Sequence, residues 1–215
     1  MYEFSVDRDN SPFPDLPRYS YSSVYGHFLN SRIPDKMIYD SLVLKPYPVD
    51  LSAFRQLKSI QNNIVDFVSE GKSISISSQY TGNGKTTWAV KLLKQYIHDN
   101  FMTFNICGYF CSMPEFVDMC KKDNKSLAEV INIMSVCDLL ILDDIAFMAP
   151  LPESSTSKLL LIMNARVNNS RSTIVTSNAS SVESLKLCLG NLLYSRIYAN
   201  ANYKIEFYGQ DRRGE

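Results

Sequence analysis

The sequence of 215 residues has no hydrophobic run long enough to cross a membrane. Its longest candidate, LLLIM at residues 159–163, is far shorter than the roughly 20 residues that a spanning helix needs. The first ten residues, MYEFSVDRDN, contain acidic side chains and no apolar segment, which excludes the pattern of a secretory signal peptide. We therefore expect a cytoplasmic protein that does not contact a membrane.

Histidine and net charge are also scarce. The chain has only His27 and His98, and its 22 basic residues balance its 22 acidic residues. Five cysteines are scattered along the chain, and the pair Cys107 and Cys111 has neither a second pair nor a nearby histidine to complete a zinc site. The cysteines are therefore expected to be reduced and buried. Any contact with nucleic acid must come from a local basic patch, because the whole chain has no basic field.

What the chain does contain is the composition of one globular domain, with 45% hydrophobic and 20% charged residues. Proline, serine, tyrosine and aspartate are frequent up to about residue 25. This predicts an extended N-terminal arm over residues 1–30 and a folded domain over residues 31–215.

Predicted strands alternate with predicted helices along this domain. The strands are expected at residues 74–78, 101–110, 137–147, 172–178 and 203–208. The helices are expected at residues 52–69, 85–99, from the capping boxes at Ser112 and Ser126, and at 155–169, 181–189 and up to Ile197. The alternation indicates an α/β fold with a parallel sheet covered by helices on both faces.

The segment TGNGKTT has the composition of a phosphate-binding loop, because glycines let backbone N–H groups turn toward a phosphate at the start of a helix. Lys85 is then expected to face solvent and reach the β- and γ-phosphates, and Thr86 to hold Mg²⁺. Gln79 stands where the pattern G-x-x-x-x-G-K-[ST] has its first glycine. The candidate nucleotide-binding residues of the loop are Thr81, Gly82, Asn83, Gly84, Lys85, Thr86 and Thr87.

The segment LLILDD predicts a buried strand with two acids at its carboxyl end, the edge at which open α/β sheets bind ligands. Downstream of a phosphate loop, this is the pattern of a Walker B motif. Asp143 is then the candidate Mg²⁺ ligand, and Asp144 the candidate base that orients and deprotonates the attacking water. The alternative is a strand followed by a solvated acidic turn.

The segment IVTSN repeats this arrangement, with an apolar strand that ends at Asn178. The functional interpretation is a sensor that hydrogen-bonds the γ-phosphate or the attacking water. The alternative is a helix N-cap or a turn residue, both of which asparagine favours.

Five spaced segments, TGNGKTT, LLILDDIAF, TIVTSN, LGNLLYSRI and FYGQDRR, together resemble the DnaC-type helicase-loader ATPases of the AAA+ superfamily. The preceding RIPDKMIYDSLVLKPY is similar to the segment before the ATPase core of that family, so the resemblance covers roughly residues 30 to 213. It implies an AAA+ P-loop ATPase domain with a minimal C-terminal lid, which binds ATP or ADP with Mg²⁺.

The resemblance also implies two arginine roles. Arg196 matches the arginine finger, which would reach the nucleotide of a neighbouring subunit in a homo-oligomer. Arg212 or Arg213 matches the arginine that touches the nucleotide within its own subunit. The alternatives are a helix-surface arginine and a solvated basic tail.

A local basic patch is expected between the second strand and the Walker B segment, where loaders line a track for single-stranded DNA. Lys121, Lys122 and Lys125 lie there and are the candidate DNA-binding residues, since basic side chains can follow a phosphate backbone. The alternative is a solvated helix end with lysines near its C-terminus.

The resemblance favours an ATPase that loads or remodels a DnaB-type replicative helicase on single-stranded DNA. Loaders usually carry a helicase-binding domain before the ATPase core, whereas only a short arm precedes about Ser31 here. One alternative is a related ATPase that assists transposition, which differs in its partner. The other is a P-loop small-molecule kinase, which would need an arginine-bearing lid and an acceptor pocket.

Overall fold

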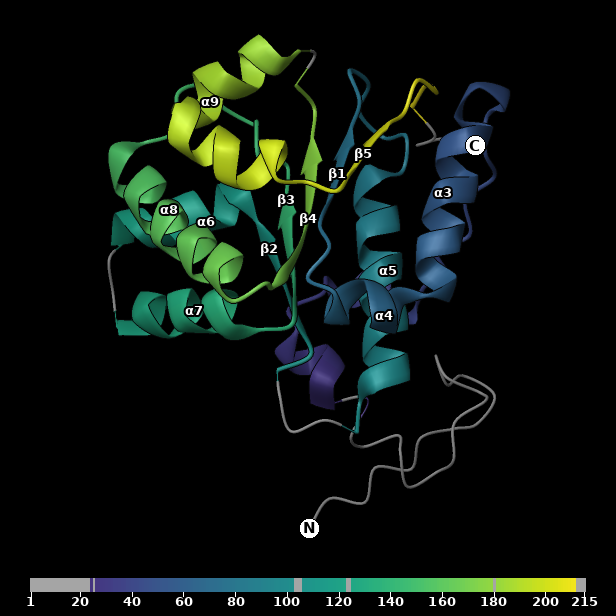
Figure 1. Ribbon diagram of the computed structural model, residues 1–215, viewed down its shortest axis with the longest axis horizontal. Coiled ribbons are helices and arrows are strands. Elements are labelled where there is room, and N and C mark those ends of the chain that lie inside the picture. The colour runs from purple at the N-terminus through teal and green to yellow at the C-terminus, as the bar shows by residue number, and fades with distance from the viewer. Residues whose placement is uncertain (1–23, 25, 103–105, 123–124, 180, 212–215) are drawn as a thin grey trace.

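A computed structural model describes residues 24, 26–102, 106–122, 125–179 and 181–211 (Figure 1). Its centre is a five-stranded sheet in the order β2-β3-β4-β1-β5, with every pair of neighbours parallel. The strands are β1 Ile74–Ser77, β2 Gly108–Ser112, β3 Leu139–Asp143, β4 Ser172–Ser177 and β5 Tyr203–Glu206. The predicted α/β fold with a central parallel sheet is therefore confirmed.

Helices cover both faces of the sheet (Figure 1). The short helix α2 Asp35–Tyr39 packs with one face, together with α3 Leu51–Asn62, α4 Ile64–Ser69 and α5 Lys85–Asn100. The other face carries α6 Met113–Lys122, α7 Lys125–Val136, α8 Glu153–Asn168 and α9 Val182–Tyr194. Among the described helices, none combines the length and hydropathy that a membrane span requires.

The sheet divides the hydrophobic core into two clusters because side chains alternate along a strand. In β3, Leu139 and Ile141 belong to the cluster under α3 and α5, whereas Leu140 and Leu142 belong to the cluster under α6, α8 and α9. All four are fully buried. A strand buried on both faces reads as a continuous apolar run, which is why LLIL was recognisable in the sequence.

Several predicted element boundaries are wrong, and the third strand is Leu139–Asp143 rather than residues 137–147. The second strand is Gly108–Ser112 rather than residues 101–110. A Cβ atom at Gly108 would lie 2.2 Å from Leu93 Cδ1 of α5, so the strand begins where a glycine allows the helix to approach closely. The helix expected over 52–69 is divided at Asn63 into α3 and α4. Ser126 lies inside the first turn of α7, because that helix begins at Lys125.

The predicted N-terminal arm is partly integrated into the domain. Val24 and residues 26–30 are helical, and the side chains of Val24 and Phe28 are fully buried in the core. This part of residues 1–30 is therefore a packed segment rather than an extended arm. The rest of the expected arm, residues 1–23 and 25, lies outside the described residues.

After β4 the chain forms α9, a π-helix over Ser195–Ala199 and the edge strand β5. Gly190 has a φ of 72° and a ψ of 163°, which interrupts α9 where the sequence predicted the end of one helix and the start of another. Residues 207–211 follow β5 without forming a helix.

A buried arginine joins the elements at the amino ends of β3 and β4. Arg166 of α8 is fully buried. Its guanidinium donates hydrogen bonds to Thr173 Oγ1 and to the carbonyls of Met134, Cys137, Asp138 and Ser172. One side chain thus connects the end of α7 with the starts of both strands, and these are the strands whose opposite ends form the candidate site.

Candidate nucleotide-binding site

The glycine loop connects the end of β1 to α5, which begins at Lys85. Gly82 and Gly84 have φ values of 68° and 100°, a left-handed conformation that favours glycine. Gln79 does not have a positive φ, so the residue that departs from the standard pattern stands where this loop does not require glycine. The loop therefore has glycine where its backbone requires a positive φ despite Gln79, and the first N–H groups of α5, which lack helical partners, can face a phosphate.

On the side away from the pocket, the loop is held by hydrogen bonds that involve segments far away in the sequence. The Asn83 side chain is fully buried and donates to Ser78 Oγ at 2.6 Å and to the Gly209 carbonyl at 3.3 Å. The carboxylate of buried Asp50 accepts the N–H group of Tyr208 at 2.7 Å and that of Gly209 at 3.2 Å. Asn83 does not line the pocket, so its side chain holds the loop in shape rather than facing a ligand.

The expectation that Lys85 faces solvent is wrong. Only 6% of the residue is exposed, and its ammonium group donates to the Tyr80 carbonyl at 2.7 Å and to Asn83 Oδ1 at 3.2 Å. Two oxygen atoms of the loop thus accept hydrogen bonds from the ammonium group and shield it from solvent. Lys85 still lines the pocket, together with Thr86 and Thr87 of the same helix.

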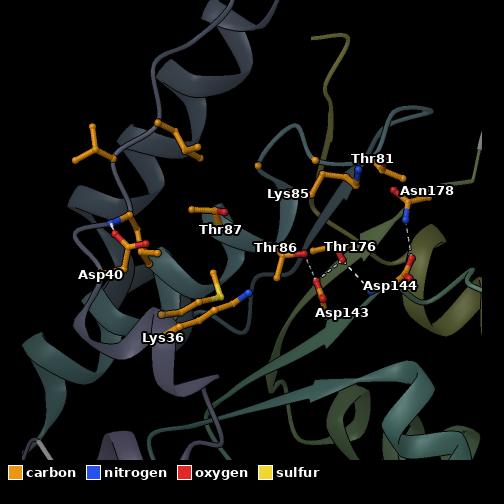
Figure 2. Close-up of a pocket in the computed structure, with 16 residues that line it drawn as sticks. Lys36, Asp40, Thr81, Lys85, Thr86, Thr87, Asp143, Asp144, Thr176 and Asn178 are labelled. Carbon is orange, nitrogen blue, oxygen red and sulfur yellow. Dashed lines mark hydrogen bonds between the residues drawn. The ribbon is translucent and has the colours of Figure 1, made fainter. Parts of the chain in front are cut away.

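Asp143, at the carboxyl end of β3, faces the loop. Its Oδ1 atom accepts hydrogen bonds from Thr86 Oγ1 at 2.8 Å and from Thr176 Oγ1 at 2.7 Å (Figure 2). Burial raises the pKa of this carboxyl group, and the two hydroxyl groups partly oppose that shift. Asp143 is therefore hydrogen-bonded to the first turn of α5, which is not the solvated acidic turn of the alternative interpretation.

Asp144 and Asn178 form a second pair at the same edge. Asp144 has a φ of 60°, which is unusual for a non-glycine residue, and its backbone N–H group donates to Thr176 Oγ1 at 2.9 Å. Asn178 Nδ2 donates to Asp144 Oδ1 at 2.8 Å (Figure 2). Within the described structure, the buried Oδ1 atom of Asn178 has no hydrogen-bond partner. Asn178 is also not the N-cap of α9, because Ser181 occupies that position and accepts from the Ser184 N–H group.

These groups line a pocket of about 700 Å³. The strand order explains why these side chains lie together, because β4 lies between β3 and β1 and the carboxyl ends of all three strands are at one edge of the sheet. The opposite wall comes from α2 and the residues after it, which sequence analysis did not identify as part of the site. The pocket-lining residues of that wall are Lys36, Met37, Asp40, Leu42, Val43 and Leu44.

The pocket has oxygen atoms of the kind that hold Mg²⁺ in a nucleotide site. Mg²⁺ is usually held by one or two protein oxygens together with phosphates and water, and the Thr86 hydroxyl and the Asp143 carboxylate lie 2.8 Å apart. The unpartnered Asn178 Oδ1 atom adds an acceptor at the same edge. In the described part of the chain, no cluster of three or more histidine, cysteine or acidic side chains offers an all-protein metal site.

The other candidate residues lie away from the pocket. Arg196 is exposed on the π-helix Ser195–Ala199 and does not line the pocket. Lys121 and Lys122 are exposed at the end of α6, where Lys122 pairs with Asp118 at 2.6 Å, and Lys125 begins α7. The two arginines expected near the C-terminus, Arg212 and Arg213, lie outside the described residues.

Comparison with protein-family models and with curated proteins finds no match. Solved structures do match. The DnaC helicase loader has a TM-score of 0.63 and 24% identity over 78% of this chain and 95% of its own. This chain has the fold of the DnaC-type loaders. DnaI has a TM-score of 0.64 and 20% identity over 85% of this chain and 95% of its own. The initiator DnaA, bound to AMPPCP and single-stranded DNA, has a TM-score of 0.60 and 21% identity over 80% of this chain and 53% of its own.

Proposed function

We propose that this protein binds and hydrolyses ATP as an AAA+ ATPase and uses that cycle to load or remodel a replicative helicase on single-stranded DNA. The observation that carries the ATPase proposal is the convergence of three chain segments on one pocket. Lys85 and Thr86 come from the glycine loop and α5, the acids from the end of β3, and Asn178 from the end of β4.

The loop N–H groups and Lys85 would hold the phosphates, and Thr86 with Asp143 would hold Mg²⁺. A bound magnesium ion offsets phosphate charge as it develops in phosphoryl transfer. Asp144 would orient a water molecule and accept its proton. Asn178 fixes the carboxylate of Asp144 through a 2.8 Å hydrogen bond and offers its free Oδ1 atom to the same water.

The position of Arg196 supports a proposal for the subunit arrangement. This arginine is exposed and absent from the lining of its own pocket. In the described structure it forms no hydrogen bond or ion pair, so it is available to a neighbouring copy. We propose that it completes the pocket of the next subunit in a homo-oligomer, so that hydrolysis depends on assembly.

The helicase-loading role rests on the sequence motifs and on the likeness to DnaC and DnaI. The match to DnaA with single-stranded DNA supports contact with a single strand. Lys121 and Lys122 are the described basic residues that we propose for this contact, with Lys125 next to them along the chain. Both are exposed at a helix end, where a phosphate backbone could reach them.

Nucleotide titration followed by calorimetry and by tryptophan fluorescence tests the ATPase proposal. Trp88 is the only tryptophan, lies in the first turn of α5, and donates its backbone N–H group to the Gly84 carbonyl at 2.9 Å. Lys85→Met keeps the buried stem and removes the ammonium group, so we expect a folded protein without measurable ATP binding. Tight ATP binding by folded Lys85→Met would refute the phosphate-loop interpretation.

Affinity capture with purified replicative helicase tests the loading role, with a transposase as the matched alternative partner. We expect ATP-dependent capture of the helicase and a rise in ATP turnover with single-stranded DNA. Capture of the transposase alone would replace helicase loading with the transposition role. Stimulation by a nucleoside acceptor, with a phosphorylated product, would instead support a kinase.

A further inference from the structure

The wall of the pocket opposite the glycine loop carries a second ammonium group. Lys36 and Lys85 are the described lysines that line the pocket, and they come from opposite sides. Lys85 is already hydrogen-bonded to loop oxygens. Lys36 is exposed and, in the part of the chain that the structure describes, forms no hydrogen bond or ion pair. Figure 2 shows its side chain extended into the pocket from the opposite wall.

None of the three carboxylates that line the pocket forms an ion pair with Lys36 in the described structure. Asp40 Oδ1 accepts the N–H group of Leu42 at 3.1 Å. Asp143 is bonded by two threonine hydroxyls, and Asp144 by Asn178. Lys36 is therefore an ammonium group without a hydrogen-bond or ion-pair partner in the described structure, whereas the other ammonium group of the pocket is buried and hydrogen-bonded to the loop. A ligand that carries several negative charges is the natural counterpart of such an arrangement.

A third lysine fixes the wall that carries Lys36. The Lys94 ammonium group donates to the carbonyls of Met37 at 3.0 Å, Ile38 at 2.7 Å and Asp40 at 2.9 Å. These carbonyls lie at the C-terminal end of α2, where helical carbonyls lack partners and a cation is favourable. Lys94 belongs to α5, the same helix that begins at Lys85. The wall that carries Lys36 is thus hydrogen-bonded to α5, the helix that follows the glycine loop.

We propose that Lys36 is a second phosphate-binding residue of the nucleotide site and that Lys94 is its positioning residue. This inference rests on the proposed function, because it requires a nucleotide in the pocket. Lys85 contacts the polyphosphate from the loop side, and Lys36 contacts it from α2. Lys94 acts without touching the nucleotide, by holding the end of α2 at a fixed distance from the loop.

Nucleotide affinity at two salt concentrations tests the role of Lys36. Calorimetric titration with ATP, ADP and AMP would compare the parent with Lys36→Gln, Lys36→Arg and the control Lys45→Gln. Lys45 is exposed in the same segment and does not line the pocket. We expect Lys36→Gln to bind ATP about tenfold more weakly, the lower end for a hydrogen bond to a charged group. The loss should shrink from ATP to AMP, and the salt dependence should weaken. Lys36→Arg and Lys45→Gln should resemble the parent.

A double-mutant cycle tests the role of Lys94. Lys94→Met should weaken ATP binding and reduce its salt dependence, whereas Lys94→Arg, which keeps a donor for the carbonyls, should restore both. If Lys94 acts through Lys36, then adding Lys94→Met to Lys36→Gln should cause little further loss. A fully additive loss would show that Lys94 affects binding by another route and would overturn its positioning role.

The outcomes separate this inference from the proposed function. If the parent does not bind ATP, the proposed function fails and the inference fails with it. If the parent binds ATP, Lys85→Met does not, and Lys36→Gln matches the parent at both salt concentrations, then only the role of Lys36 is overturned. An equal loss for Lys45→Gln and Lys36→Gln would show a general charge effect and would also overturn it.

Discussion

Replacing the buried arginine of α8 tests how the candidate site is supported from the far edge of the sheet. Arg166→Met fills a similar volume but removes every donor of the guanidinium group. Four backbone carbonyls and the Thr173 hydroxyl then lose a hydrogen bond inside the protein. Breaking a buried charged network of this kind costs about 3–5 kcal/mol. Because native domains are stable by only about 5–15 kcal/mol, this is a large fraction of the total.

Urea denaturation followed by Trp88 fluorescence measures that loss. With a denaturant slope of about 2 kcal/mol per molar urea, a loss of about 4 kcal/mol lowers the midpoint by about 2 M. Arg166→Lys keeps the charge and fewer donors, so its midpoint should lie between those of the parent and Arg166→Met. Arg55→Met removes an exposed arginine of α3 and should shift stability by no more than about 0.5 kcal/mol. A loss below about 1 kcal/mol for Arg166→Met would refute the reasoning.

Two further predictions concern the site. Asp144→Asn should bind Mg-ATP but hydrolyse it slowly, whereas Asp143→Asn should weaken the Mg²⁺ dependence of the activity. Parent-like turnover by both variants would leave LLILDD as a structural strand only. Because burial raises the pKa of the Asp143 carboxyl group, its ionised form costs stability at neutral pH. Asp143→Asn should therefore resist urea better than the parent at pH 7, and the difference should shrink as the pH falls into the range where the parent carboxyl is protonated. Arg196→Ala should keep ATP affinity but lose most of its hydrolysis rate, roughly 10³-fold for an arginine finger, and should regain some activity when mixed with Lys85→Met. Hydrolysis that is independent of protein concentration, with no recovery in the mixture, would return Arg196 to a surface role.

The local motifs of the site could be predicted from the sequence because their chemistry lies within a few residues of chain. The glycine loop, the acids after β3 and Asn178 after β4 each combine an apolar strand with a polar end. The parallel order of the strands then brings them to one edge. The sequence pattern contained that information without any knowledge of distant contacts.

The residues that were missed depend on contacts between distant segments. Thr176 faces Asp143 only because β4 pairs with β3 in one register, and a threonine inside a strand is otherwise an ordinary β-former. Lys36 lines the pocket from α2, whose C-terminal end is hydrogen-bonded to Lys94, 56 residues beyond Ile38. Arg166 looks like an exposed helix residue in the sequence, since arginine is rarely buried. The solvent exposure of Lys85 was mispredicted because the loop oxygens that shield its ammonium group approach it only when the loop is folded.

The attachment of the glycine loop to chain segments before and after it in the sequence has a consequence for local unfolding. Asn83 is bonded to the Gly209 carbonyl, and Gly209 is bonded in turn to Asp50. Opening of the loop would therefore break its hydrogen bond to the chain after β5, which is itself hydrogen-bonded to the turn before α3. Segments that open together form one cooperative unit. A nucleotide that stabilises the loop would thus also reduce local unfolding of the chain at Asp50 and at Gly209.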